Sequence, residues 1–155
     1  MGILSETEVR GLAATLHASQ VDKAGRPYIE HLERVMLILK DRWPNASSDE
    51  IAAAWLHDAL EDTDVTPGSL LAAGVSPETV RIVEAVTRPP GSVYLDWVAG
   101  LAANGDKSVI RMKLADNQDN RDPAKVAALP AAAEMVATRY EPVRRLLEEG
   151  LAKAG

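Results

Sequence analysis

The sequence has no cysteine and no phenylalanine among its 155 residues. Without cysteine there are no disulfides, no thiolate nucleophile and no thiolate metal site, so a bound metal would need nitrogen and oxygen ligands. Basic residues are scarce relative to acids, and the net charge of −6 argues against a broad nucleic-acid surface. Long apolar runs are missing too, because no stretch approaches the roughly 18 uncharged apolar residues of a transmembrane helix.

The amino-terminal segment MGILSETEVRG lacks the basic region followed by an apolar region that marks a signal peptide. We therefore expect a cytoplasmic location and no membrane partner. Hydrophobic residues make up 46% of the chain, which is enough to fill one core. Because there is no repeat, low-complexity linker or break in composition, residues 1–155 are interpreted as a single domain.

Helix signals dominate the chain. Capping boxes, cap-plus-proline pairs and a proline in a first turn predict helix starts at Ser5, Pro27, Ser47, Thr66 and Ser76. Residues 93–103, 123–129 and 131–152 are also predicted to be helical. Residues 109–114 alternate as a strand would, but a single strand has no partner, so helix is the better prediction. The predicted fold class is all-α.

The stretch WLHDALEDTD at residues 55–64 places a histidine and four acids directly after an alanine-rich apolar run. On a helix with about 100° per residue, Asp58 and Asp62 project onto the rim of the apolar stripe. Carboxylates there lose hydration and repel one another, and each is disfavoured by ~0.3–1 kcal/mol at the negative end of the helix dipole. A divalent cation would remove these penalties; the alternative is a frayed helix end whose acids face water.

A metal needs further ligands. His31 lies on the edge of an apolar helical stripe, and Asp116 directly follows the apolar pair Leu114-Ala115. Taken alone, His31 would be a core or surface histidine and Asp116 a cap or turn residue. Together with the histidine and first aspartate of the acidic stretch they form a nitrogen and oxygen set of formal charge −2, which suits manganese, iron or zinc. The ligand set is His31, His57, Asp58 and Asp116.

Two further aspartates continue the spacing of three residues that begins at Asp116. Asp119 and Asp122 are interpreted as residues of a solvated helix face or a cap. Asp62 and Asp64 begin like a calcium-binding loop, but the positions that require glycine and glutamate hold Pro67 and Ala73. A calcium loop is therefore not expected.

Three ordered motifs resemble those of a known family. The sequence reads HASQVDKAGRPYIEH at 17–31, LHDALEDT at 56–63 and KLADNQDN at 113–120. These resemble H-x-G-Q-x-R-K-x-G-x-P-Y-I-x-H, L-H-D-x-x-E-D-T and K-L-A-D-x-x-x-N of the HD-domain metal-dependent phosphohydrolases. The branch is that of the RelA/SpoT hydrolase domain and its small stand-alone relatives, which hydrolyse (p)ppGpp. The resemblance covers residues 10–122.

The resemblance implies an HD-domain helical bundle and a bound metal, usually manganese, with Fe²⁺ or Zn²⁺ as alternatives. It implies that the ligands are His31, His57, Asp58 and Asp116. Glu61 and Asp62 correspond to the catalytic acid pair. Lys23 corresponds to a basic residue near the substrate phosphates, Asn120 to a residue that touches the sugar, and Tyr140 to a tyrosine on the nucleotide side.

These residue types suit hydrolysis. A divalent cation lowers the pKa of a bound water, and Glu61, one turn after His57, can act on that water as a general base or orient it. Asp62 can position the water or protonate the leaving group, and Lys23 can offset charge on the phosphoryl oxygens. The predicted reaction is attack of water at phosphorus, with release of pyrophosphate or phosphate from (p)ppGpp or a related nucleotide.

The sequence also departs from the branch. Asp22 stands where the branch has arginine, Ser19 replaces a glycine, and the segment after Asp116 is more acidic. These changes weaken affinity for a highly anionic nucleotide unless something compensates. Two alternatives stay open: the same chemistry on NADPH or a nucleoside phosphate, and a non-catalytic nucleotide-binding module, against which the intact acid pair argues. No prediction of oligomeric state follows.

Overall fold

The computed structural model describes residues 2–129 and 131–154, and every named element within them is a helix, joined to the next by turns or loops. Extended pairing over those residues is limited to one isolated bridge between Val21 and Pro27, in the loop after the first helix. The all-α prediction is therefore confirmed. Over the same residues, none of the helices combines the length and apolar character needed to cross a membrane.

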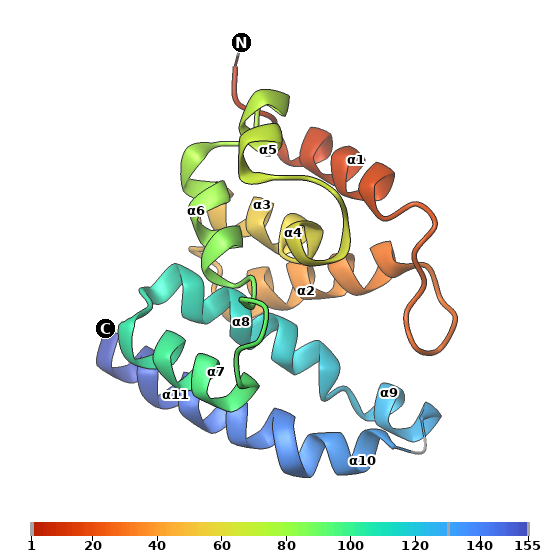
Figure 1. The fold of residues 1–155 in the computed structure, drawn as a ribbon, viewed down its shortest axis with the longest axis vertical. Coiled ribbons are helices and arrows are strands. Elements are labelled where there is room, and N and C mark those ends of the chain that lie inside the picture. Colours follow the sequence, from red (N-terminus) through yellow and green to blue (C-terminus); the bar gives the residue numbers. More distant parts are fainter. Residues whose placement is uncertain (1, 130, 155) are drawn as a thin grey trace.

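The helices follow one another as shown in Figure 1. Their bounds are α1 (Glu6–Leu16), α2 (Tyr28–Arg42), α3 (Ser48–Leu56), α4 (Ala59–Asp62), α5 (Pro67–Ala73), α6 (Pro77–Ala85), α7 (Tyr94–Asn104), α8 (Lys107–Asn120), α9 (Pro123–Ala128), α10 (Ala132–Met135), a π-helical turn (Val136–Tyr140) and α11 (Glu141–Ala154). The stretch that alternated like a strand lies inside α8, so the helix prediction there is confirmed.

Local capping sets most helix starts. Ser5 and Ser47 each close a capping box at the start of α1 and α3, because the serine side chain accepts from the backbone N–H of a glutamate that bonds back. Thr66 and Ser76 cap α5 and α6 ahead of a proline. Gly74 ends α5 with φ of 104°, a left-handed conformation that favours glycine. The helix starts predicted at Ser5, Ser47, Thr66 and Ser76 are confirmed.

The helix that carries the acidic stretch is broken. α3 ends at Leu56, and α4 begins only at Ala59, so His57 and Asp58 form a turn between two helices. The break changes the phase of α4 relative to α3. The prediction that Asp62 lies on the rim of the apolar stripe is therefore wrong, because that residue is exposed, whereas Asp58 is half-buried as the rim position requires.

The carboxy-terminal helix is also interrupted. Residues 131–152 were predicted as one helix, but the turn Val136–Tyr140 is π-helical and separates α10 from α11. Pro142 lies just beyond it. A proline lacks an N–H and its ring crowds the carbonyl four residues earlier, so a wider turn there relieves the clash. The turn carries Arg139 and Tyr140, which both line cavities described below.

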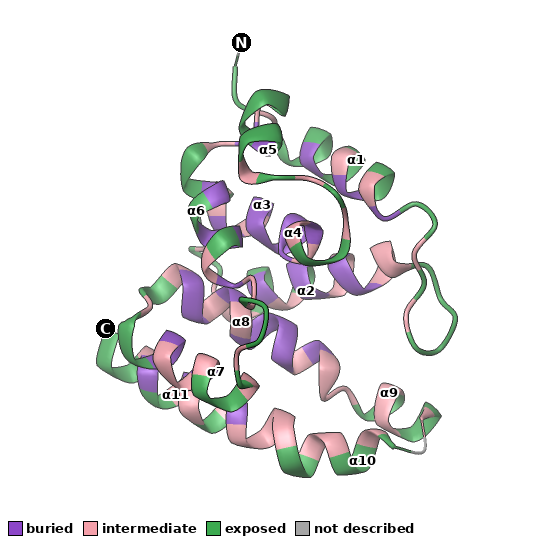
Figure 2. Ribbon diagram, in the orientation of Figure 1, coloured by how far each residue is buried: buried purple, intermediate pink, exposed green. Residues whose placement is uncertain are grey.

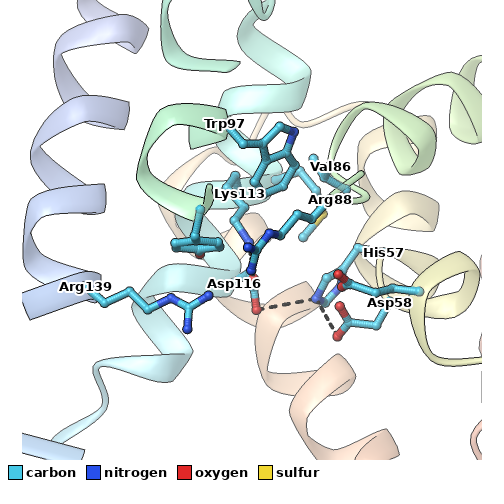
Figure 3. Close-up of a pocket in the computed structure, with 11 residues that line it drawn as sticks. His57, Asp58, Val86, Arg88, Trp97, Lys113, Asp116 and Arg139 are labelled. Carbon is cyan, nitrogen blue, oxygen red and sulfur yellow. Dashed lines mark hydrogen bonds and ion pairs between the residues drawn. The ribbon is translucent and has the colours of Figure 1, made fainter. Parts of the chain in front are cut away.

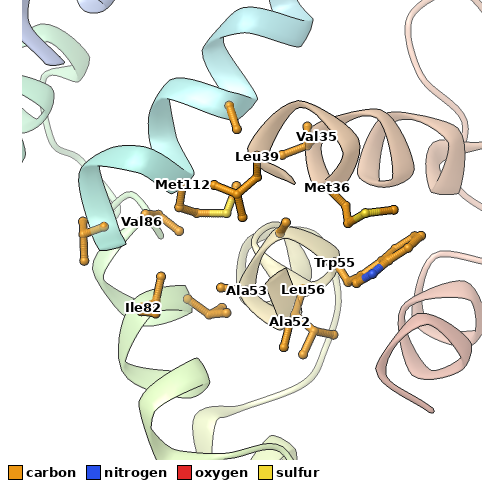
Figure 4. Close-up of a cluster of buried hydrophobic side chains, with 14 of the residues drawn as sticks. Val35, Met36, Leu39, Ala52, Ala53, Trp55, Leu56, Ile82, Val86 and Met112 are labelled. Atoms are coloured by element: carbon orange, nitrogen blue, oxygen red, sulfur yellow. The ribbon is translucent and has the colours of Figure 1, made fainter. Parts of the chain in front are cut away.

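The core is built around α3. This helix packs against α1, α2, α6 and α8, and Figure 2 shows the buried residues concentrated along it and along α8. Its small side chains, Ala52, Ala53 and Ala54, let neighbouring helices approach closely. Figure 4 shows Leu39 of α2, Ile82 of α6 and Met112 of α8 around them. α8 in turn packs against α2 and α11, and so links the pair α2 and α3 to the pair α7 and α11.

One close helix contact depends on a missing side chain. Gly150 of α11 is buried against α7, and a Cβ atom there would lie 3.1 Å from the Cα of Ala102 and nearer still to the Ala102 carbonyl oxygen. The neighbouring atoms are backbone, so they cannot rotate away. This contact fixes the distance between α7 and α11.

Gly150→Ala should therefore destabilise the protein by about 1–3 kcal/mol, because α7 and α11 must move apart. Gly100→Ala is the matched control: it lies within α7, and a Cβ there meets no atom within 4 Å. It should be neutral or stabilise the helix by up to about 1 kcal/mol. Urea denaturation followed by circular dichroism compares the two. Equal stability of both variants would contradict the close contact.

Candidate functional site

Four polar side chains from separate parts of the chain meet beside α3. His31 comes from α2, His57 and Asp58 from the turn after α3, and Asp116 from α8. His31 Nε2 lies 3.2 Å from Asp116 Oδ1 and 3.7 Å from Asp58 Oδ2. His57 Nε2 lies 3.1 Å from Asp58 Oδ2 and 3.5 Å from Asp116 Oδ1. These four residues, the predicted ligand set, are called the metal cluster below.

The two imidazoles are oriented by their outer nitrogens. His57 Nδ1 donates to the Ala54 carbonyl at 2.8 Å, and His31 Nδ1 donates to Asp119 Oδ2 at 2.6 Å. In the neutral ring, the proton is therefore on Nδ1, and Nε2 presents a lone pair to the carboxylates. His57 Nε2 is buried and has no hydrogen-bond partner among the described residues. Lone pairs that face carboxylate oxygens in this way require a positive charge between them.

The shifted pKa values of the cluster residues also indicate that a positive charge is needed between the imidazoles and the carboxylates. Burial lowers the pKa of His57, but the negative charges of Asp58 and Asp116 raise it well above its usual value. The pKa of Asp116 is held well below its usual range by Lys113 and the histidines, despite burial. A divalent cation would supply the positive charge that extra protons on the imidazoles would otherwise supply. His31, His57 and Asp58 each offer a donor atom within 4.8 Å of the others, and such a nitrogen and oxygen set fits a divalent metal.

Asp119 supports the cluster from behind His31. It is only 2% exposed and accepts from His31 Nδ1, from Arg34 Nε at 2.8 Å and from Lys125 Nζ at 2.5 Å. Burial raises its pKa, but these hydrogen bonds lower it far below its usual value. The interpretation of Asp119 as a solvated residue is wrong. The sequence feature that could have indicated its role is the spacing of three residues from Asp116, which places Asp119 on the same face of a helix.

Asp122 is the cap residue that was predicted. It precedes α9 and accepts from the backbone N–H of Ala124 at 3.3 Å. The difference between it and Asp119 is tertiary, because only Asp119 lies on the face of α8 that meets α2.

Both carboxylates of the cluster are also held in place. Tyr28 donates its hydroxyl to Asp58 Oδ2 at 2.5 Å, and burial together with Asp58 raises the tyrosine pKa, so it stays protonated. Lys113 Nζ donates to Asp116 Oδ2 at 3.0 Å, which leaves Oδ1 toward the histidines. Asp116 raises the pKa of Lys113 despite burial, so the lysine stays charged.

The predicted acid pair lies on the short helix α4. Glu61 lines a cavity together with His57 and Asp58. Both side chains are exposed, but partial loss of hydration and the charge of Asp58 still raise the pKa of Glu61 and of Asp62. Asp62 Oδ2 accepts from Gln20 Nε2 at 3.0 Å, and Gln20 Oε1 lies 2.6 Å from His17 Nδ1. The loop after α1 thus anchors Asp62.

A wide cavity of about 410 Å³ opens on the His31 side of the metal cluster. All three predicted substrate residues, Lys23, Asn120 and Tyr140, line it, so the fold brings them together. Its other walls are largely apolar and include Tyr28, Leu129 and Met135. Asp22 also lines it, but Asp22 Oδ1 accepts from the backbone N–H groups of Ala24 and Arg26 and so shapes the loop.

A narrow cavity of about 130 Å³ opens on the other side of the cluster, where His57, Asp58 and Asp116 form part of its wall (Figure 3). Glu61 lines it, and so do three basic residues, Arg88, Lys113 and Arg139. Neither Arg88 nor Arg139 was predicted from the sequence as a site residue. Arg88 precedes a proline-rich loop and Arg139 precedes a predicted site residue, but neither position by itself indicates a cavity.

Asp119→Asn should weaken Mn²⁺ binding about 10- to 100-fold, because the amide would turn a donor toward Arg34 or Lys125 and no longer fix His31. Asp122→Asn, three residues along the chain, keeps a good helix cap and should bind Mn²⁺ like the wild type. Isothermal titration with Mn²⁺ measures both. Matching affinities for the two variants would remove Asp119 from the site.

Known proteins resemble the chain in sequence. A family model described as HD domain matches residues 10–121. A Synechocystis sp. protein named probable guanosine-3′,5′-bis(diphosphate) 3′-pyrophosphohydrolase is 42% identical over 119 residues, which are 70% of this chain and 15% of that protein. An Aquifex aeolicus protein named guanosine-3′,5′-bis(diphosphate) 3′-pyrophosphohydrolase is 36% identical over 110 residues, 67% of this chain and 15% of its own length. The chain thus spans 15% of the length of these relatives.

A solved structure has the same fold. It is described as a metazoan ortholog of SpoT that hydrolyzes ppGpp and plays a role in starvation responses. The TM-score is 0.68 at 22% identity, and the match covers 97% of this chain and 95% of that one. The helical bundle therefore agrees with that fold over nearly the whole chain.

Proposed function

Because the chain belongs to the HD-domain family, we propose that it is a metal-dependent phosphohydrolase that releases pyrophosphate from (p)ppGpp. The predicted resemblance to this family is confirmed. The observation that carries the proposal is the convergence of the metal cluster, with both Nε2 atoms directed at the carboxylates, beside the carboxylate of Glu61. The names of the curated relatives support the choice of substrate.

His31, His57, Asp58 and Asp116 would hold the cation. When bound, it supplies a positive charge that lowers the pKa of a nearby water and offsets charge on phosphoryl oxygens. We propose manganese, with Fe²⁺ or Zn²⁺ as alternatives, because nitrogen and oxygen donors suit all three. Tyr28 and Lys113 hold the two carboxylates in orientation, and Asp119 and the Ala54 carbonyl hold the two rings.

The acid pair carries the proton transfers. Glu61 takes a proton from the water as it attacks the phosphorus attached to the 3′ oxygen of the ribose. The bond between that phosphorus and the 3′ oxygen breaks, and the oxygen takes up a proton. We propose that Asp62 supplies that proton, because partial loss of hydration and the charge of Asp58 raise its pKa and favour the protonated form. From ppGpp the products are GDP and pyrophosphate.

The wide cavity suits the nucleoside. Tyr28 and Tyr140 offer aromatic surface. Asn120 lies next to the metal cluster, with Nδ2 3.4 Å from Asp116 Oδ1, and its side-chain amide can form hydrogen bonds to a sugar. Lys23 supplies a positive charge at the same cavity. We propose these roles for Lys23, Asn120 and Tyr140 as part of the same function.

A second candidate is the same chemistry on NADPH or a nucleoside phosphate. Asp22 favours it, because a carboxylate lines the wide cavity at a position where the RelA/SpoT branch has arginine. A non-catalytic nucleotide-binding module is less well supported, because Glu61 lies at the cavity wall next to the metal cluster, where a sensor has no need of it.

The purified protein with Mn²⁺ should release pyrophosphate from ppGpp, and Asp58→Asn should abolish the release. Glu61→Gln should lower kcat by about 10²- to 10⁴-fold, the usual contribution of a general base, while the protein still binds Mn²⁺. Glu149→Gln, an exposed change on α11, is the control and should leave kcat unchanged. Product release and metal content are measured on the same samples.

Measurements of kcat/KM on ppGpp, NADPH and simple nucleoside phosphates decide between the two candidate substrates. We expect the highest kcat/KM on ppGpp. A higher value on NADPH or a nucleoside phosphate would favour the second candidate. Stoichiometric nucleotide binding by the manganese-loaded protein, with no turnover of any substrate, would contradict both and leave the binding module.

A further inference from the structure

Three basic side chains gather around one aromatic ring in the narrow cavity. The guanidinium carbon of Arg139 lies 3.7 Å from the centre of the Tyr94 ring, that of Arg88 lies 5.4 Å from it, and Lys113 Nζ lies 5.6 Å from it. These residues come from the π-helical turn, from the loop after α6 and from α8. Figure 3 shows Arg88, Lys113 and Arg139 converging toward Asp116 and His57.

Such a gathering has an electrostatic cost. Like charges repel, and partial burial in a cavity strengthens that repulsion because less water screens it. Stacking on Tyr94 offsets part of the cost, by about 0.5–2 kcal/mol for each favourable cation and ring pair. Two of the three carboxylates that line the same cavity, Asp58 and Asp116, belong to the metal cluster. With a cation bound there, an anion in the cavity would offset the remaining repulsion among the basic residues.

The charge of Lys113 is already neutralised, because it pairs with Asp116 at 3.0 Å. The two arginines are different. Arg88 donates to the hydroxyl and the carbonyl of Ser92, both of which are uncharged, and these bonds fix its position. Arg139 Nε is buried and has no hydrogen-bond partner among the described residues. Neither arginine forms an ion pair with a carboxylate in the described part of the chain.

The position of the cavity indicates which anion it accepts. His57, Asp58 and Asp116 line the narrow cavity, and His31 lines the wide one, so the metal cluster lies between the two. A substrate with its nucleoside in the wide cavity and its reacting phosphorus at the cluster would extend its next phosphate into the narrow cavity. The volumes of about 410 and 130 Å³ suit a nucleoside and a phosphate group, respectively.

We propose that Arg88 and Arg139 form a subsite for the terminal phosphate of a diphosphate whose inner phosphorus lies at the metal cluster. The inference rests on the proposed function and deepens it, because it selects diphosphate esters over monophosphate esters. Guanidinium groups suit this role, since their N–H donors match phosphate oxygens in pairs. The subsite also supplies the compensation that the acidic residue Asp22 and the net charge of −6 call for.

Inorganic pyrophosphate is the direct probe, because it can span the cluster and the subsite without any turnover. Isothermal titration of the manganese-loaded protein should show pyrophosphate binding that Arg139→Gln and Arg88→Gln each weaken about 10-fold or more, as expected for a lost hydrogen bond between charged groups. Inorganic phosphate, which reaches the cluster alone, should lose less affinity. Arg145→Gln, an exposed change on α11, is the matched control and should bind pyrophosphate like the wild type.

The two arginine variants come from different elements, so one still tests the subsite if the other fails to fold, which thermal melting detects. Wild-type affinity for pyrophosphate in a folded Arg139→Gln or Arg88→Gln protein would overturn the proposal. An equal loss of phosphate and pyrophosphate affinity would also overturn it, because the arginines would then act on the cluster.

The test of the arginine subsite can be distinguished from the test of the proposed hydrolase function. Arginine-dependent pyrophosphate binding with no hydrolysis of ppGpp would keep the subsite and reject the hydrolase. Hydrolysis of ppGpp with pyrophosphate binding that does not depend on the arginines would keep the hydrolase and reject the subsite.

Discussion

Two imidazole nitrogens lie 3.1–3.7 Å from the oxygens of two carboxylates beside a tightly packed helix, and this arrangement governs the rest of the site. Left without a positive charge, lone pairs and anions at these distances would repel one another. Burial strengthens the repulsion because it removes water. The surrounding residues therefore serve to hold the four donors together and to favour a cation among them.

The holding groups come from several elements. The Ala54 carbonyl belongs to α3, Asp119 and Lys113 to α8, and Tyr28 to the first turn of α2. The Ala54 carbonyl, Asp119 and Lys113 bind ligand atoms that face away from the metal cluster. Tyr28 instead donates to Asp58 Oδ2, the oxygen that faces the two imidazoles. Because the ligands and their supports lie on α2, α3 and α8 or in the turn directly after α3, the packing of these helices also sets the geometry of the site. The small side chains of the alanine-rich α3 let these helices approach one another closely.

The two cavities divide recognition between them. The wide cavity is largely apolar and has few charges, so it suits the flat base and sugar of a nucleotide. The narrow cavity brings Arg88, Lys113 and Arg139 beside Glu61 and the carboxylates of the metal cluster, and with a cation at the cluster it suits phosphate. The π-helical turn before Pro142 contributes consecutive residues, Arg139 and Tyr140, to different cavities. A local irregularity in α10 and α11 thus connects both halves of the proposed substrate site.

The sequence by itself determined the features that depend on neighbouring residues. Ser47 and Thr66 start helices and Gly74 ends one because a cap is a hydrogen bond or a backbone angle within a few residues. The helical class and the motifs that hold His57 and Asp116 could be recognised for the same reason. In contrast, Asp119 and Asp122 look alike in sequence, and only the packing of α8 against α2 buries one of them. The break at His57 and Asp58, the exposure of Asp62 and the meeting of Arg88 with Arg139 around Tyr94 were likewise decided by tertiary structure. Contacts between residues far apart in the chain depend on which helix faces pack together, and no local pattern contains that information.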